Sequence, residues 1–557
     1  MLRSVLSAIG VSSKEVMAKA CARFVVAWLF LSALVNLRFP GDETKLSYLW
    51  PSSDVTLLFA LFALAQLRGW RLPRWHLPLL VFGVCLIRVL RFGDGIQQNY
   101  FHRPFNAYLD LPQLPELVRL LWATSSHAVF VLGAVASVLL VVALVYAIRW
   151  ALREAHSFMS DAKRRSLFFG VVLALVVLSP FGPKAHGDEQ FSGMFASSIV
   201  PRVVDEADFL LHVSGYREVK LREVRAIANR LQSAPNSLAR LESLPVFVFL
   251  VESYGVTVFD PELTSPPMQA ALDDFDAALK ASGYSVATGL LDSPVYGGSS
   301  WLAQATLATA VQTRDEAQLA LVKAEEPPTI ADFFKRAGYR TVLVQPGTTR
   351  PWPERDYLRF EARYAAFDLG YRGPKFSWAP MPDQYVLDVI HRKEVETATR
   401  PLFITYALVS SHAPWSEQPR VVEDWNHLSD GDIFNRMPKV HFDTRLVGSN
   451  AVREAYLSSI RYDLSVLARY LGERLKNDAL VFVLGDHQPI PKATAHSKRR
   501  SVPVHVISRR RQLLEPWYAR GYRPSLRPNL AEPVAPLASF LPTLLEAMSP
   551  PRVGVPG

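Results

Sequence analysis

The chain has 557 residues, half of them hydrophobic, with a formal net charge of +10 and two cysteines, Cys21 and Cys85. This length exceeds what one hydrophobic core supports, so we expect at least two domains. No DNA- or RNA-binding motif is visible, and the basic residues of the first third flank apolar segments, which excludes nucleic-acid binding as the reason for the charge. No cysteine follows Cys85, which excludes a disulfide or a catalytic thiol in the rest of the chain.

Five apolar segments in the first third predict membrane-spanning helices. Lysine and arginine cluster before the first segment, between the second and third, and between the fourth and fifth, whereas the alternate loops mix both signs. Because positively charged loops stay on the cytoplasmic side, this pattern predicts a cytoplasmic amino terminus and an external location for everything after Pro183. The segments are 22–37, 46–67, 77–90, 121–148 and 166–183.

Three regions follow from this pattern: a transmembrane domain at 1–183, a polar connector at 184–243 and an external domain at 244–557. Apolar residues at helical spacing predict helix over 206–231, and Gly215 is a point at which this helix can divide. Two interpretations stay open for this element. It lies on the membrane surface, or it packs on the external domain.

The external domain alternates between short apolar strands and amphipathic helices. Such alternation predicts an α/β domain with a mostly parallel central sheet and helices on both faces. The predicted strands are 245–251, 341–345, 402–409, 479–484 and 503–507, and the predicted helices are 268–281, 329–337, 452–475 and 536–548.

Two of these strands end in residues suited to a metal ion. Glu252 follows the first strand, and Asp486 and His487 follow Gly485 after 479–484. Ligands of open α/β sheets bind beyond the carboxyl ends of the strands, and carboxylate oxygen with imidazole nitrogen suits a divalent ion. Singly, each motif is more often an ordinary polar turn, so the metal site depends on the three residues meeting.

A glycine-rich turn supplies a candidate nucleophile. Gly297-Gly298-Ser299-Ser300 precedes an apolar, helix-forming run. The start of a helix offers unpaired N–H groups and a partial positive charge, which suit an alkoxide and a phosphate. Serine needs a base or a metal ion to become nucleophilic. The alternative is that Ser299 or Ser300 only caps the helix.

Further candidates follow two other strands. His412, in Ser410-Ser411-His412 after 402–409, suits proton transfer to a leaving group or contact with a phosphoryl oxygen. After 341–345, Trp352 and Arg355 occur in Trp-Pro-Glu-Arg, where Arg355 can clamp a phosphate and Trp352 can wall a headgroup pocket. Each of the three is also compatible with a purely structural role.

Five motifs resemble those of the lipoteichoic acid synthases in their order along the chain: Glu252, the turn Gly297-Gly298-Ser299-Ser300, Trp352-Pro-Glu-Arg355, Ser410-Ser411-His412 and Gly485-Asp486-His487. With the phosphoethanolamine transferases and the periplasmic-glucan phosphoglycerol transferases, these enzymes belong to the alkaline phosphatase and sulfatase superfamily. The resemblance covers nearly the whole chain in layout, with five amino-terminal spans before an alkaline phosphatase/sulfatase-like external domain. In residues it covers short motifs only.

The resemblance implies that Glu252, Asp486, His487 and the serine nucleophile hold one divalent metal ion. Mn²⁺ is the first choice, with Mg²⁺ or Zn²⁺ as alternatives. It also implies that Trp352, Arg355 and His412 contact the headgroup and phosphate, with His496 as a further contact or ligand. The best-known of these transferases use threonine as nucleophile, whereas here the choice is Ser299 or Ser300, and we favour Ser300. The synthases have a histidine just before the glycine of the Trp/Arg segment, whereas this chain has Gln345-Pro346-Gly347 there. This difference leaves the identity of the headgroup and of the acceptor open.

The sequence therefore predicts an enzyme of the bacterial inner membrane with a periplasmic catalytic domain. It would move a phospho-headgroup from a membrane phospholipid to a glycan or another hydroxyl acceptor through a covalent phosphoserine, with phosphoglycerol as first choice and phosphoethanolamine as second. Alternatives are a phosphodiesterase or phosphatase using the same site, and a non-catalytic membrane protein that keeps the fold. A sulfatase is disfavoured, because the Pro and Arg of its Cys/Ser-x-Pro-x-Arg motif do not follow Ser299 or Ser300.

Overall fold

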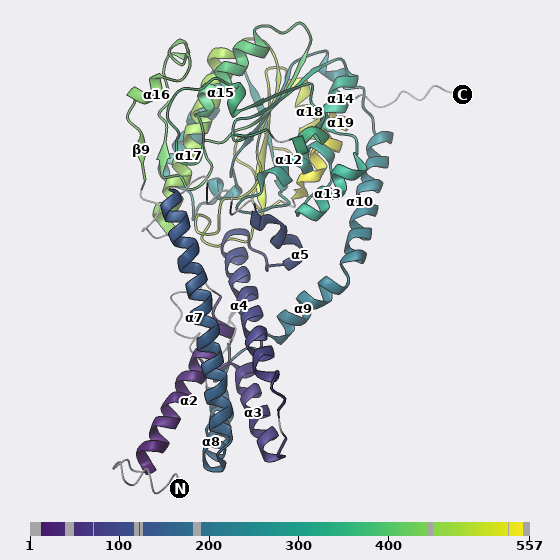
Figure 1. The fold of residues 1–557 in the computed structure, drawn as a ribbon. Helices are drawn as coiled ribbons and strands as arrows, with labels where there is room; N and C mark the ends of the chain where they lie inside the picture. Colours follow the sequence, from purple (N-terminus) through teal and green to yellow (C-terminus); the bar gives the residue numbers. More distant parts are fainter. Residues whose placement is uncertain are drawn as a thin grey trace, which may run out of the picture. The chain divides into compact units, whose positions relative to one another are not determined.

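The computed structural model describes residues 13–38, 50–70, 72–115, 118, 122, 126–181, 191–351, 353–442, 449–532 and 534–549. The chain divides into two compact units, and Figure 1 labels their elements. The first unit comprises Met1–Asn99 and Arg103–Val213, and the second comprises Tyr100–His102 and Ser214–Gly557.

The first unit is built from apolar helices. Aromatic side chains form its core, where Phe24 stacks on Phe158 at a centroid distance of 4.1 Å and meets the edge of Phe168 at 6.0 Å. Its longer helices are α2 (Ser13–Asn36), α3 (Ser53–Leu67), α4 (His76–Phe101), α7 (His127–Met159) and α8 (Ala162–Leu178), with the short α5 (Ala107–Asp110) after α4.

Three helices among the described residues are long and apolar enough to cross a membrane: Lys14–Asn36, His127–Met159 and Ala162–Phe181. They correspond to the first, fourth and fifth predicted spans. The second and third predicted spans do not meet this criterion of length and apolar composition. Helix α3 has only 15 residues, and residues 46–49 of that predicted span lie outside the described chain. Helix α4 has 26 residues but carries Arg88, Arg91 and Asp94, which lower its hydropathy.

The predicted connector helix is divided at His212 rather than at Gly215. Helix α9 (Val200–Leu211) belongs to the first unit, and α10 (Val213–Ser233) lies almost wholly in the second. Val224 of α10 is fully buried in a cluster with Val311 and Val322. Of the two interpretations, packing on the following domain therefore applies to α10.

An eight-stranded sheet forms the centre of the second unit, in the order β12-β4-β11-β10-β3-β7-β5-β6. Strands β10, β3, β7, β5 and β6 run parallel, which confirms the mostly parallel sheet. Strand β11 is antiparallel to both of its neighbours, β10 and β4. The strands are β3 (Val246–Val251), β4 (Ser285–Asp292), β5 (Arg340–Gln345), β6 (Ala362–Ala365), β7 (Leu402–Ala407), β10 (Leu480–Gly485), β11 (Ser501–Ser508) and β12 (Ala535–Pro536).

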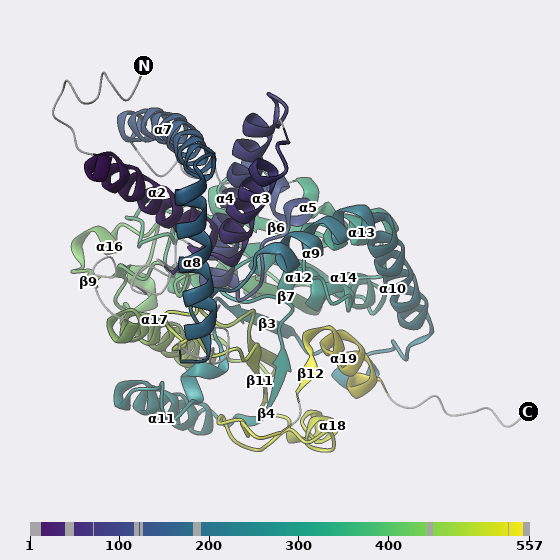
Figure 2. The ribbon, with the colours of Figure 1, turned by 90° about the horizontal axis from the view of Figure 1, so that it is seen from below.

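Helices cover both faces of this sheet, as predicted. Successive residues of a strand point to opposite faces, so Phe247 and Phe249 of β3 enter one core while Val246 and Val248 enter the other. Seen from below, α11 and α17 lie on one side and α14 and α19 on the other (Figure 2). The helices of this unit include α11 (Pro266–Ala281), α12 (Ser300–Thr309), α13 (Glu316–Glu325), α14 (Ile330–Arg336), α15 (Asp383–Ile390), α17 (Ser449–Arg469) and α19 (Phe540–Met548).

Three strands of this sheet were not predicted from the sequence, namely the two-residue β12 and the longer β4 and β6. Strand β4 reads Ser-Val-Ala-Thr-Gly-Leu-Leu-Asp, and its small and polar residues hide the apolar run that marks a buried strand. Strand β6 has four residues at the edge of the sheet and contains Arg363. Both acquire strand geometry from their neighbours rather than from their own composition.

Candidate metal centre and active site

The register between β3 and β10 brings two carboxylates together. Val251 pairs with Gly485 in parallel strands, so the next residues, Glu252 and Asp486, leave the sheet side by side at its carboxyl edge. Gly485 permits this approach, because a Cβ there would lie 1.9 Å from the carbonyl oxygen of Tyr254. A parallel sheet thus positions the first two predicted ligands through backbone pairing alone.

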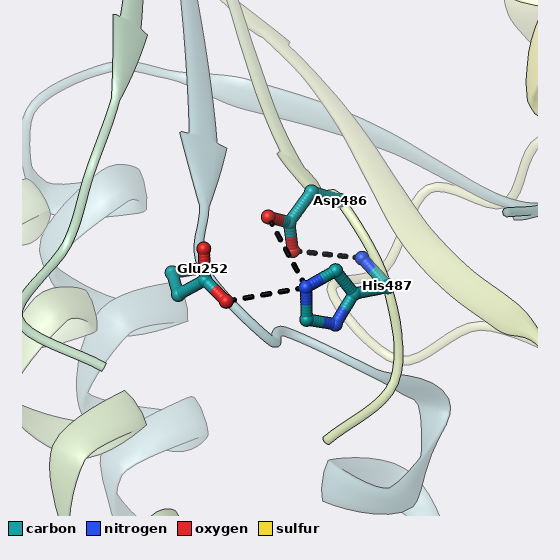
Figure 3. A group of neighbouring side chains, drawn as sticks. All are labelled: Glu252, Asp486 and His487. Carbon is teal, nitrogen blue, oxygen red and sulfur yellow. Dashed lines mark hydrogen bonds and ion pairs between the residues drawn. The ribbon is translucent and has the colours of Figure 1, made fainter. Parts of the chain in front are cut away.

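Backbone amides and His487 complete the group (Figure 3). The N–H groups of Ser253 and His487 donate to Asp486 Oδ1 at 2.8 and 2.7 Å. His487 Nε2 lies 3.2 Å from Glu252 Oε1 and 3.7 Å from Asp486 Oδ2. Its other nitrogen, Nδ1, bonds the carbonyl oxygen of Gln488 at 2.7 Å, and this bond directs Nε2 towards the carboxylates.

The donor set fits a divalent cation. Glu252, Asp486 and His487 are buried and each offers one ligand atom, and these atoms lie within 4.8 Å of one another. Two carboxylate oxygens with one imidazole nitrogen is a combination that divalent metals accept. Buried carboxylates this close repel one another unless a positive charge lies between them.

The proton affinities of the three groups reflect this crowding. Burial, followed by the charge of Glu252, raises the pKa of Asp486 to about 7. Burial lowers the pKa of His487, but Asp486 and Glu252 outweigh it and raise that pKa to about 9. Burial also acts to raise the pKa of Glu252, but His487, with a smaller contribution from His412, holds it well below its usual range. The carboxylates of Glu252 and Asp486 therefore stabilise a positive charge placed beside them.

A strained turn delivers Ser300 to the same place. Gly297, Gly298 and Ser299 have φ values of 69°, 156° and 63°, and α12 begins directly after them. The N–H of Gly297 donates to the carbonyl oxygen of Gln488 at 3.0 Å, which holds the turn against the loop that carries His487. Glycine adopts such φ values without strain, whereas Ser299 adopts its value at a cost.

The hydroxyl of Ser300 enters the carboxylate and histidine group. Ser300 Oγ donates to Glu252 Oε2 at 2.8 Å and lies 3.1 Å from His487 Nε2. Ser299 occupies the N-cap position of α12 and makes no side-chain cap hydrogen bond. Of the two serines, Ser300 is the one that lies against the candidate ligands.

The segment after β7 reaches the same edge of the sheet. Leu250 of β3 pairs with Ala407 of β7, and the hydroxyl of Ser411 donates to the carbonyl oxygen of Glu252 at 2.7 Å. The next residue, His412, is half-buried, and its Nδ1 lies 2.6 Å from the carbonyl oxygen of Ala413. His412 is therefore presented beside Glu252, with its Nδ1 hydrogen-bonded to the local backbone.

Three predicted contact residues are not placed in this group. Trp352 lies outside the described residues, and Arg355 is described only by its backbone, in a 3₁₀ helix at Pro353–Leu358. His496 is exposed, and its backbone N–H donates to Pro491. Within the part of the chain that the structure describes, the candidate metal ligands that come together are Glu252, Asp486 and His487, without His496.

Sequence reasoning missed two residues near His412. The indole of Trp378 stacks on the His412 ring at a centroid distance of 3.8 Å and an interplanar angle of 19°. Asp383, at the start of α15, accepts hydrogen bonds from the N–H groups of Val409 at 2.9 Å and Ser410 at 2.6 Å. Both contacts join residues about 30 positions apart, so no local spacing in the sequence signals them.

The second unit is thus an α/β domain with a buried acidic and histidine group and a helix-borne hydroxyl at one edge of its sheet. Residues 281–548 match the model of the Sulfatase family. For residues 281–548, this match confirms the resemblance to the alkaline phosphatase and sulfatase superfamily. It includes Ser300, His412, Asp486 and His487, and Glu252 precedes it.

Three solved structures illustrate what the chain is similar to. A lipoteichoic acid synthase from Listeria monocytogenes has 13% identity and a TM-score of 0.37, covering 55% of this chain and 72% of that one. Lipooligosaccharide phosphoethanolamine transferase A from Neisseria meningitidis has 15% identity and a TM-score of 0.46, covering 95% of both chains. A Streptococcus pyogenes phosphoglycerol transferase in complex with sn-glycerol-1-phosphate has 14% identity and a TM-score of 0.34, covering 59% and 92%. No curated protein sequence matches this chain.

Proposed function

We propose that this protein transfers a phospho-headgroup from a membrane phospholipid to a hydroxyl acceptor, with a glycan as the first choice of acceptor. Phosphoglycerol is the preferred headgroup and phosphoethanolamine the second choice. The observation that carries the proposal is the position of Ser300 Oγ, within hydrogen-bond distance of both Glu252 and His487 at the start of α12.

Glu252, Asp486, His487 and Ser300 would hold one divalent ion, with Mn²⁺ preferred over Mg²⁺ or Zn²⁺. When bound, such an ion lowers the pKa of a coordinated hydroxyl and neutralises negative charge on a phosphodiester. The protein's own contribution is to keep the four side chains in place through the β3–β10 register and the turn at 297–299.

In the first half of the proposed reaction, Ser300 Oγ gives its proton to Glu252 Oε2, which accepts its hydrogen bond at 2.8 Å, and attacks the phosphorus of the lipid headgroup. The bond from phosphorus to the diacylglycerol oxygen breaks, and His412 donates a proton to that oxygen. The products are diacylglycerol and a headgroup phosphate esterified to Ser300. The unpaired N–H groups at the start of α12 favour the negative phosphate.

In the second half, an acceptor hydroxyl attacks the same phosphorus and gives its proton to His412. The bond between phosphorus and Ser300 Oγ breaks, Oγ takes its proton back from Glu252, and the acceptor leaves with the phospho-headgroup. Nδ1 of His412 is bonded to the backbone, so Nε2 is the nitrogen that carries the proton in both halves. Trp352, Arg355 and His496 stay predicted headgroup or phosphate contacts.

Apolar helices in the same chain suit a lipid donor. The helices that can cross a membrane precede the external domain, so the donor headgroup need not leave the bilayer surface. We accordingly place the protein in a bacterial inner membrane, with 244–557 on the periplasmic side. A sulfatase reaction is not proposed, because Ser300 is followed by Trp301 and Leu302 rather than by the Pro and Arg of the formylglycine motif.

Paired serine variants test this function. Mass spectrometry would follow lipids and periplasmic glycans in cells that carry the wild-type protein, Ser300→Ala or Ser299→Ala. We expect Ser300→Ala to abolish both diacylglycerol release and glycan modification, and Ser299→Ala to retain both. An active Ser300→Ala protein would contradict the assignment of the nucleophile. Diacylglycerol release without a modified glycan would instead indicate water as the acceptor and a phosphodiesterase.

A further inference from the structure

Trp378 is an exposed aromatic residue beside the proposed acid and base. Its side chain is 37% exposed, although its indole stacks on His412 at 3.8 Å. The indole also lies against the backbone after β5, since a Cβ built on Gly347 would be 3.0 Å from Trp378 Cη2. Trp378 therefore sits at the carboxyl edge of the sheet, next to the proposed site.

A tight turn holds this indole in place. Phe376 and Ala379 exchange two backbone hydrogen bonds, of 3.1 and 2.9 Å, and both are almost fully buried. Between them, Ser377 has a φ of 54°, and its hydroxyl accepts a hydrogen bond from Ser416 Oγ at 3.3 Å. A strained residue within an anchored turn keeps a large apolar ring partly in water, which is typical of a binding element rather than of a core.

We propose that Trp378 forms the acceptor subsite of the enzyme, a platform on which a sugar ring of the glycan stacks. The proposal rests on the function given above. His412 covers one face of the indole and Gly347 lies against its Cη2 and Cζ3 atoms, so a ligand would contact the 37% of the side chain that stays exposed. A pyranose has a flat apolar C–H face that matches an indole, whereas a glycerol headgroup has none. A sugar held there brings a hydroxyl within reach of His412.

The lipid headgroup is the other conceivable occupant. An ethanolamine ammonium group is attracted to an aromatic face, but a protonated His412 stacked on the same indole would repel it. Phosphoglycerol carries neither a positive charge nor a ring. Both considerations favour the acceptor over the donor.

The test separates the two halves of the reaction in the full-length protein, reconstituted in nanodiscs with phosphatidylglycerol or with phosphatidylethanolamine. Without an acceptor, diacylglycerol release and the mass of the Ser300 adduct report the first half. Two acceptors are then supplied in separate reactions: a β-linked glucose trisaccharide, which has sugar rings, and glycerol, which has none. Trp378→Ala removes the platform, Trp378→Phe keeps an aromatic face, and Phe367→Ala removes another exposed aromatic residue of the same domain as a control.

We expect Trp378→Ala to lower transfer to the trisaccharide by about fivefold, through KM, because the lost aromatic contact is worth on the order of 1 kcal/mol. Adduct formation and transfer to glycerol should change by less than about twofold. Trp378→Phe should recover most of the lost transfer, and Phe367→Ala should match the wild type.

Three results would overturn the acceptor subsite. They are an equal loss of adduct formation in Trp378→Ala, an equal loss of transfer to glycerol, or a wild-type protein that does not prefer the trisaccharide to glycerol. Failure of the proposed function looks different, because the wild type would then release no diacylglycerol from either lipid.

Discussion

Asp383 and Ser410 are joined by two reciprocal hydrogen bonds. The N–H of Ser410 donates to Asp383 Oδ2 at 2.6 Å, and the N–H of Asp383 donates to Ser410 Oγ at 3.0 Å. Because His412 is two residues further along, this pair anchors the segment that presents it. Asp383 is fully buried, so its bonds to the backbone are not weakened by competition with water.

Asp383→Asn should lower the free energy of unfolding by about 1–3 kcal/mol, because the amide NH2 would replace Oδ1, which lies 3.0 Å from the Val409 nitrogen, so that two donors would face each other. It should also lower kcat while leaving metal affinity nearly unchanged, since the candidate ligands belong to other segments. Thermal unfolding in detergent and metal titration measure the two effects. Asp273→Asn is the matched control, because Asp273 forms an exposed ion pair with Arg527 and should matter little. Equal losses in both variants would exclude an anchoring role for Asp383.

Removal of divalent metal should lower the unfolding temperature and abolish turnover. Glu252 and Asp486 are both buried, and without a cation their carboxylates repel one another. Saturation with Mn²⁺ at about 100 times its Kd would stabilise the fold by about 2.7 kcal/mol. Calorimetric titration of the chelated protein with Mn²⁺, Mg²⁺ and Zn²⁺ measures affinity and preference.

Asp486→Asn should weaken metal binding by about 100-fold or more, because it removes a charged ligand from the group. Glu262→Gln, at an exposed carboxylate of the same domain, is the control and should bind as the wild type does. Undiminished binding by Asp486→Asn would place the metal elsewhere.

His412→Ala should lower kcat by about 10²- to 10⁴-fold, the usual contribution of a general acid and base. The Ser300 adduct should still form with a donor whose leaving group needs no proton, such as a nitrophenyl phosphodiester. His427→Ala, at an exposed histidine, should leave kcat unchanged. If a nitrophenyl donor reacted as slowly as the lipid, a role for His412 in proton transfer would be untenable.

The surroundings of His505 predict how acidic pH changes the free energy of unfolding. It is fully buried between Tyr254, whose hydroxyl is 3.0 Å from Nε2, and Thr288, whose hydroxyl is 2.8 Å from Nδ1. Burial lowers its pKa to about 3. The unfolded chain binds this proton near pH 6.5 and the folded chain does not, so His505 contributes full stability above that pH and loses it as the pH falls towards 3.

His505→Gln should therefore remove part of the acid-induced destabilisation. Unfolding temperatures of wild type and variant, measured from pH 7.5 to 4, should converge as the pH falls below about 6.5. Parallel curves over this range would show that His505 does not titrate on unfolding.

Local sequence determined much of this protein. Alternation of apolar strands with amphipathic helices sufficed to predict the parallel sheet, because burial on both faces requires continuous apolar strands. Glu252, Asp486 and His487 were identifiable because each directly follows such a strand. Gly297 and Gly298 similarly marked the turn before Ser300.

The tertiary structure determined the features of the site that depend on contacts between residues distant in the sequence. The pairing of Val251 with Gly485 brings Glu252 to Asp486, and the left-handed backbone of Ser299 selects Ser300 for contact with Glu252. The contact of Trp378 with His412 joins separate loops. Side-chain periodicity reports which face of an element is buried but not which element covers it, and strand register and loop packing are set by the fold as a whole.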